Sequence, residues 1–226
     1  MKLSETSSRH VAVSRLLRYR RGMSPRELSF QSPASRYGIS AFEYFNRAIK
    51  CKKSATTETP AYWFYCALEL RCCIERIIFE YLVLIGSGAV EPKIESLYRP
   101  RELKRALLKE EPEFFTKLNF LNVLFEALGV ADRVHIPNLE KLNIYYGKFG
   151  SYLHAPKRDD KSHEDNAWWQ NLYTLTDECI QYIREILSSM RASITLNDFG
   201  LHFYNLYKSG IFSKDAVVAN MELSNK

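Results

Sequence analysis

The sequence predicts an all-α protein, a single-domain helical bundle built around one long buried helix. Three observations support this class. Apolar residues recur three and four positions apart in most segments, and no segment of useful length alternates between apolar and polar residues as a strand does. The stretch 61–85 is apolar and is bounded by helix start and stop signals. With 226 residues, 46% of them hydrophobic, the chain has the size and composition of one domain with a full-sized core.

The long helix is expected over Ala61–Ile85. Thr59 is a favourable N-cap, and Pro60 suits the first helical position because its missing N–H is not needed there. Gly86 and Gly88 end the helix. Apolar side chains lie on almost every side of it, which predicts that other helices surround it.

Shorter helices are expected on both sides of the long one in the sequence. Apolar residues share one face of these segments, and Pro and Gly residues separate them. The C-terminal segment is expected to form a small helical hairpin that breaks at Gly210. The predicted ranges are Ser40–Lys52, Arg101–Glu110, Glu113–Leu128, Asn138–Leu153 and Asp198–Lys226.

A second long helix is expected at about Glu164–Ala192. Its apolar residues from Trp169 to Met190 alternate three and four apart, a seam suited to lengthwise packing on another long helix. Two partners fit this seam. One is the helix 61–85 of the same chain, which we favour, and the other is the same helix of a second copy in a homodimer.

The net positive charge is confined to the N-terminus. Residues 1–36 hold eight basic and two acidic residues, a net charge of +6, so the remaining 24 basic and 24 acidic residues cancel. This divides the chain into a basic arm (1–36), a helical bundle domain (37–196) and a C-terminal helical appendage (197–226). Three interpretations of the arm stay open: a solvated strap packed on the body, an organelle-targeting peptide, or a segment that binds nucleic acid through Arg15, Arg18, Arg20 and Arg21.

Cysteine usage and hydropathy predict a cytoplasmic protein without a membrane span. The five cysteines are odd in number and show no C-x-x-C spacing, which argues against a disulfide framework or a zinc site. Charged residues interrupt the most apolar stretch, and Met1–Lys2 is not followed by the apolar segment of a signal peptide. The sequence has no P-loop, G-x-G-x-x-G, G-x-S-x-G or H-E-x-x-H motif. No cofactor, metal or membrane partner is expected.

Charged residues inside the long apolar helix form the first candidate site. Arg71 and Glu75 are four residues apart and share a face, as do Arg76 and Glu80. Charges are costly to bury unless they are paired. They are therefore either a salt-bridge network that fixes helix packing, the interpretation we favour, or the polar floor of a pocket.

Two histidine-bearing segments form the other candidates. His154 ends a helix that also carries Lys148, and it either interacts with the helix C-terminus or serves as a general acid–base group. The segment Arg158–His163 precedes the second long helix. It is either a solvated loop or part of a phosphate site at the helix N-terminus.

The segments Ala67–Glu75 and Tyr146–His154 together carry a family resemblance. A long charged helix followed by such a histidine-ended helix resembles the HEPN-type helical domains of prokaryotes, which occur in toxin–antitoxin, abortive-infection and CRISPR-associated proteins. The resemblance covers at most residues 40–194. Lys148 stands where the family places an arginine before His154, whereas Arg158 and His163 have the family's arginine–histidine spacing.

The resemblance implies a small, often dimeric helical bundle that acts as a metal-independent endoribonuclease. Two motifs would meet across a homodimer, with the ribose 2′-OH as the nucleophile. The histidines would transfer protons, a basic residue of the motif would hold the scissile phosphate, and the pair on the long helix would orient the site. The implied site residues are His154, His163, Arg158, Lys148, Arg71 and Glu75.

The expected function is therefore an RNA-targeting protein, an endoribonuclease of a phage-defence or toxin–antitoxin system. RNA, a second copy of the chain, or a protein of the same defence system would be its partner. The alternative is a non-catalytic helical module that binds RNA or protein or serves in assembly. A histidine and an arginine or lysine that converge in a cleft would favour the enzyme.

Overall fold

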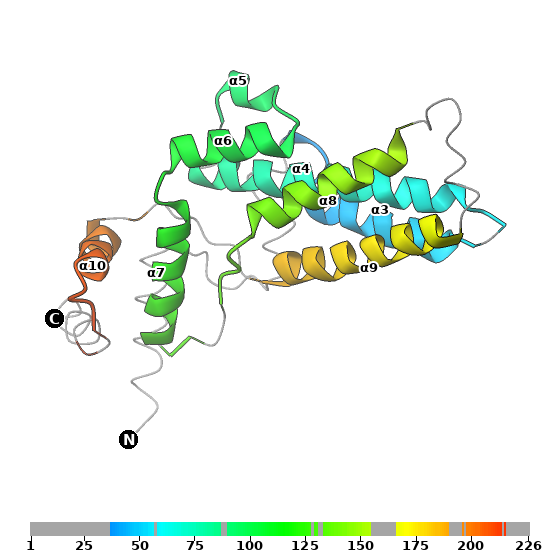
Figure 1. Cartoon of the computed structure of the whole chain (residues 1–226). Coiled ribbons are helices and arrows are strands. Elements are labelled where there is room, and N and C mark those ends of the chain that lie inside the picture. The colour runs from blue at the N-terminus through cyan, green and yellow to red at the C-terminus, as the bar shows by residue number, and fades with distance from the viewer. Residues whose placement is uncertain are drawn as a thin grey trace. The chain divides into compact units, whose positions relative to one another are not determined.

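The computed structural model describes residues 37–56, 58–86, 90–127, 129–130, 133–154, 166–189, 196, 198–213 and 215 (Figure 1). Over these residues the chain forms helices and no β-strand, which confirms the all-α class. The described residues fall into two compact units. The α4 unit takes its described residues from Ser32–Glu110 and Pro137–Ser188, and the α7 unit takes its described residues from Glu111–Ile136 and Ser189–Lys226. The predicted boundaries at residues 36 and 196 stay predictions.

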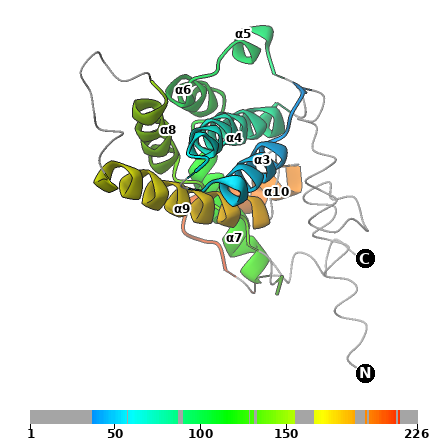
Figure 2. The ribbon, with the colours of Figure 1, turned by 90° about the vertical axis from the view of Figure 1, so that its right-hand side faces the viewer.

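The α4 unit is arranged around the helix α4 (Ala61–Ile85), whose range is the one expected from the sequence. Helix α4 packs against four others, as Figure 2 shows. Its second half, from Ile77 to Val83, is buried on every side. The neighbouring helices are α3 (Ala41–Ser54), α6 (Pro100–Glu110), α8 (Leu139–Leu153) and α9 (Asn166–Ser188).

The first half of α4 is not surrounded as the sequence suggested. Tyr62, Tyr65 and Leu68 follow one another at three-residue intervals on one face, and their exposed fractions are 39%, 54% and 47%. The rings of the two tyrosines meet edge to face, with centroids 6.0 Å apart. An uncovered apolar stripe therefore runs along the amino-terminal half of α4.

The start of α4 differs from the prediction by one residue. Pro60, rather than Thr59, is the N-cap, and no side chain caps the helix. The Thr59 hydroxyl instead donates to the carbonyl of Ser54 at 3.1 Å, while the Thr59 carbonyl accepts from the N–H of Tyr62 at 3.2 Å. The hydroxyl is thus used to close the loop between α3 and α4 rather than to cap the helix.

The helices α3 and α8 begin with side-chain caps. Ser40 and Glu43 form a capping box on α3, in which Glu43 Oε2 accepts from the Ser40 N–H at 2.8 Å. Asn138 Oδ1 accepts from the N–H of Lys141 at the start of α8. The Asn138 N–H donates to the Tyr182 hydroxyl at 2.7 Å, which joins the start of α8 to α9. These caps fix where the two helices enter the unit.

The apolar seam of α9 packs inside its own chain. Helix α9 contacts α3, α4 and α8, so the favoured one of the two predicted seam partners is the one observed. An ion pair between Lys52 and Asp177 also joins α3 to α9. The buried seam residues are Leu172, Thr176, Cys179, Ile183 and Ile186.

A short helix that the sequence did not predict, α5 (Pro92–Glu95), precedes α6. With four residues it is below the length at which apolar periodicity can be recognised. Ile94 buries its side chain, and Pro92 stands in the first turn. Helix α6 is joined to α8 by the ion pair between Lys104 and Glu140.

The α7 unit contains α7 (Phe114–Ala127) and α10 (Asp198–Lys208), which pack together. The Phe120 ring meets the rings of Tyr204 and Phe212 at centroid distances of 5.4 and 5.7 Å. Gly210 has a φ of 73°, and the Ile211 N–H donates back to the carbonyl of Leu206, which ends α10. The predicted break at this glycine is therefore observed.

Several predicted features lie outside the described residues. They are the basic arm 1–36, the segment 155–165 and the chain after residue 215. None of the helices in the described part of the chain has the length and hydropathy needed to cross a bilayer.

Candidate functional site

The packing of α4 against α8 builds the candidate site. Arg71 and Glu75 lie one turn apart on α4, both half-buried, and both meet Tyr146 of α8. The guanidinium carbon of Arg71 lies 4.2 Å from the centroid of the Tyr146 ring, a close cation–π contact. The two charged groups predicted to pair are therefore joined through an aromatic residue of a second helix.

The protonation of these three groups is linked. Burial raises the pKa of the Glu75 carboxyl, while a hydrogen bond with Tyr146 and the positive charge of Arg71 oppose the shift. Burial also raises the pKa of the Tyr146 hydroxyl, and a hydrogen bond from Arg71 opposes that shift. Glu75 therefore holds its proton more tightly than an exposed carboxyl does, although a cation stands beside it.

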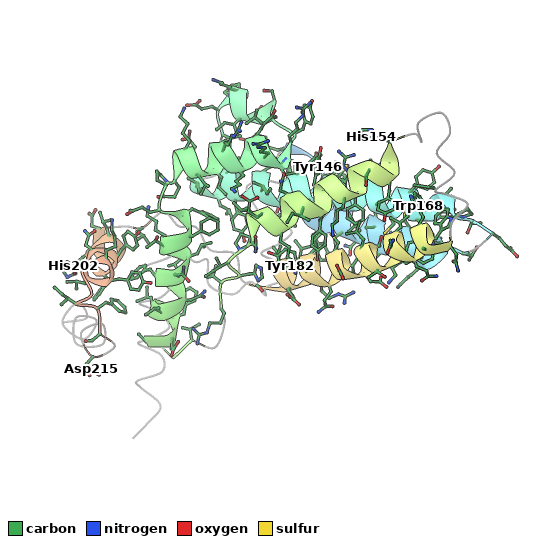
Figure 3. The ribbon with its side chains drawn as sticks, viewed as in Figure 1. Tyr146, His154, Trp168, Tyr182, His202 and Asp215 are labelled. Carbon is green, nitrogen blue, oxygen red and sulfur yellow. The ribbon has the colours of Figure 1, made fainter. Side chains whose placement is uncertain are left out.

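His154 lies on the same face of α8 as Tyr146. Tyr146, Gly150 and His154 follow one another every four residues, so they form one row along the helix. A Cβ placed on Gly150 would lie 4.0 Å from Nη1 of Arg71, so the guanidinium rests against this row. His154 is exposed at the end of the helix (Figure 3). Its backbone N–H donates to the Gly150 carbonyl at 3.0 Å.

Arg71 of α4 thus contacts the two turns of α8 that precede His154. One turn of four residues advances about 6 Å along a helix. Along α8, about one such turn therefore separates the glycine beside Arg71 from His154. The sequence predicted Arg71 and His154 as site residues. It did not predict the contacts of Arg71 with Tyr146 and Gly150.

Lys148 is not part of this row. It lies two residues after Tyr146 and therefore points about 200° around the helix from it. Its side chain is exposed, and its carbonyl accepts a hydrogen bond from the Ser151 hydroxyl at 2.7 Å. The structure places Lys148 away from Arg71 and Glu75.

The remaining predicted site residues lie outside the described residues, and their roles stay predictions. They are Arg158, His163, Arg15, Arg18, Arg20 and Arg21.

The second charged pair of α4 supports the packing of α3. Arg76 Nε lies 3.6 Å from Glu80 Oε1, and the same oxygen accepts the N–H of Ala41 at 2.8 Å. Ala41 is the first residue of α3, so Glu80 satisfies a donor that has no partner within its own helix. Arg76 also donates to the carbonyl of Tyr37 at 3.2 Å. Arg76 and Glu80 therefore form the kind of salt bridge that was predicted to fix helix packing.

A pocket of about 440 Å³ also has Glu75 in its lining. It lies between the segment before α3 and the helices α3, α4, α5 and α6. Because five separate segments form it, no local pattern in the sequence could have predicted it. The lining residues are Tyr37, Ile39, Tyr44, Cys72, Glu75, Arg76, Phe79, Glu95, Leu97, Tyr98 and Leu103.

No cluster of three or more His, Cys, Asp or Glu side chains that could hold a metal ion occurs in the described segments. Comparison of the chain with protein-family models, with curated proteins and with solved structures gives no match.

Proposed function

We propose that this protein is a HEPN-like RNA-targeting protein of a prokaryotic defence or toxin–antitoxin system, and that it cleaves RNA without a metal ion. One observation carries the proposal. Of the two segments that resemble the family, one places the Arg71 guanidinium against Gly150 of α8, and the other ends in the exposed His154 four residues later. An exposed imidazole near a guanidinium is suited to proton transfer beside a phosphate.

In the proposed reaction, neutral His154 accepts the proton of the ribose 2′-OH. The 2′-oxygen attacks the adjacent phosphorus, and the bond from phosphorus to the 5′-oxygen breaks. A protonated His154 of a second copy gives its proton to the departing 5′-oxygen. The products are a 2′,3′-cyclic phosphate and a 5′-hydroxyl end, and no metal ion takes part in this step.

Arg71 would neutralise charge that develops on the phosphate. The cation–π contact with Tyr146 and the carboxyl of Glu75 would hold the guanidinium in place. This assigns to Arg71 the phosphate-holding role for which the resemblance offered Arg158 or Lys148. Separate Arg71→Lys, Arg158→Met and Lys148→Met variants distinguish the three residues.

The test is cleavage of single-stranded RNA in a buffer that contains EDTA. His154→Ala should lower the cleavage rate by about 10²- to 10⁴-fold, the usual contribution of a general acid–base group. His202→Ala is the matched control, because His202 is an exposed histidine on α10. His163→Ala tests the other histidine of the resemblance. Absence of cleavage by the wild type, or equal loss in the control, contradicts the proposal.

The uncovered stripe of Tyr62, Tyr65 and Leu68 favours a second candidate, a non-catalytic module that binds RNA or protein. Exposed aromatic rings offer stacking surfaces for unpaired bases and anchors for protein partners. Tyr65→Ser should then weaken binding while RNA stays intact. Deletion of residues 1–36 tests the arm, since an electrostatic contribution to RNA binding would be lost together with part of the salt dependence.

The proposal also includes a homodimer and a protein partner of the same system. Light scattering over a range of concentrations tests the dimer, and a monomer at every concentration would argue against cleavage by paired sites. Induced expression in bacteria tests the defence role. The wild type should arrest growth, and His154→Ala should not.

A further inference from the structure

The pocket beside Glu75 has the properties of a small-molecule site. Its volume of about 440 Å³ lies within the range of roughly 300–1,000 Å³ found for such sites. Tyr37, Tyr44, Phe79 and Tyr98 give it aromatic walls, and a few charged groups converge on it. Such a mixture of rings and few polar groups is typical of sites that orient one small ligand.

The charges that line the pocket leave it electronegative. Arg76 is the cation among the lining residues, and it is engaged by Glu80, by the Tyr37 carbonyl and by the Phe79 ring, whose centroid lies 5.0 Å from its guanidinium. Glu80 balances its charge. Glu75 also lines the pocket, but it bonds Tyr146 and lies beside Arg71, so the carboxyl of Glu95 remains as the lining group available to a ligand.

The tyrosines of the wall already attract cations. The guanidinium of Arg47 lies 5.8 Å from the Tyr44 ring centroid, and that of Arg99 lies 5.6 Å from the Tyr98 ring centroid. Neither arginine lines the pocket. Tyr98 is 58% exposed, so its ring stands at a position that an entering ligand can reach. Aromatic faces and carboxyls together are the chemistry that recognises ammonium groups.

We propose that the pocket between α3, α4, α5 and α6 binds an organic ammonium ion. The cationic head lies among the aromatic rings with Glu95 as its counter-charge, and a short tail contacts Leu97 and Leu103. The electronegative lining disfavours a phosphate. Glu75 belongs to this lining and to the site at Arg71, but ammonium binding does not require the RNA chemistry proposed at His154.

The test uses three molecules of similar size in place of the unidentified ligand. Choline and ethanolamine carry a quaternary and a primary ammonium group, and 3,3-dimethylbutan-1-ol is the neutral carbon analogue of choline. Cys72 lines the pocket, whereas the half-buried Cys51 does not. The rate at which a maleimide alkylates each thiol in the full-length protein, measured by peptide mass spectrometry, reports occupancy of the pocket.

At saturation, choline and ethanolamine should slow alkylation of Cys72 about fivefold or more and leave Cys51 unchanged, whereas the neutral alcohol should have no effect. Calorimetric titration provides a readout that is independent of the thiols. Protection by only one of the two ammonium ions supports the proposal and identifies the kind of head group. Equal protection by the neutral alcohol, or no saturable binding of either cation, overturns it.

Two exposed substitutions test the recognition chemistry against matched controls. Glu95→Gln removes the counter-charge and Tyr98→Leu removes one ring, and each should weaken choline binding by about threefold or more. Glu110→Gln and Tyr65→Leu make similar changes at exposed positions outside the pocket lining and should not alter choline binding. Unchanged affinity in both pocket variants would also overturn the proposal.

Discussion

Removal of the Glu80 charge tests whether a buried carboxyl of α4 holds α3 in place. Glu80 is 3% exposed, and its Oε1 accepts the N–H of Ala41 at 2.8 Å and lies 3.6 Å from Arg76 Nε. The substitution Glu80→Gln keeps the shape of the side chain and an acceptor for Ala41. It leaves Arg76, whose side chain is 11% exposed, without its carboxylate.

Two effects set the magnitude. The hydrogen bond to Ala41 changes from a charge-assisted one to a neutral one, a loss of about 1 kcal/mol. Removing the carboxylate beside the buried Arg76 guanidinium adds to this loss, since breaking a buried ion pair from one side costs roughly 3–5 kcal/mol. Arg76 keeps its contacts with the Tyr37 carbonyl and the Phe79 ring, which reduces the second effect. We expect the free energy of unfolding to fall by about 3 kcal/mol.

Urea denaturation followed by circular dichroism measures the change. The matched control is Glu43→Gln, which alters the exposed carboxyl that caps the same helix and should cost less than about 1 kcal/mol. The double variant Arg76→Gln/Glu80→Gln should lose less than the sum of its single variants, because no charge is left unpaired. A loss for Glu80→Gln as small as that of the control would show that the Glu80 charge does not hold α3 in place.

Three further predictions concern the site and its surroundings. Burial raises the pKa of Glu75, so the stability this group contributes is fully present below the unfolded-state pKa and is lost as the pH rises through the folded-state pKa. In urea titrations at a series of pH values, Glu75→Gln should therefore gain stability relative to the wild type as the pH rises above about 4, and a decline would contradict this. In the folded protein at about pH 8, a maleimide should alkylate Cys51 far faster than Cys66. Cys66 is fully buried, and burial raises the pKa of its thiol to about 12. Peptide mass spectrometry measures the two rates, and equal rates would show that the core opens. Gly150→Ala should stabilise the protein by up to about 1 kcal/mol in urea denaturation, because alanine favours a helix more than glycine does. The new methyl group would lie at an ordinary contact distance from Arg71, so a loss of stability would indicate a tighter fit.

Local signals were sufficient to predict much of the fold. The limits of α4 follow from Pro60 and Gly86, which no helix interior accommodates easily, and from the apolar content between them. Helix α9 was predicted because its apolar residues repeat along a seam. The exposed stripe at Tyr65 could not be predicted, since apolar content does not reveal which neighbours a helix lacks.

The site was predictable only in part. The charged residues of α4 were predicted to form a site because charges are costly to bury unless they are paired. The prediction that Arg76 and Glu80 form an ion pair is confirmed. The partner of Arg71 is Tyr146, which is 75 residues away in the sequence and belongs to a contact between two helices. Periodicity describes one helix at a time, so it cannot identify such a partner.

In the proposed reaction, Arg71 and His154 act on the same phosphate. A kinetic double-variant cycle with Arg71→Lys, His154→Ala and the combined variant tests this through the rate of RNA cleavage in EDTA. Residues that act as a unit show strongly non-additive losses. We expect the combined variant to cleave at about the rate of the slower single variant. Multiplied losses in the combined variant, or an inactive wild type, would contradict the claim.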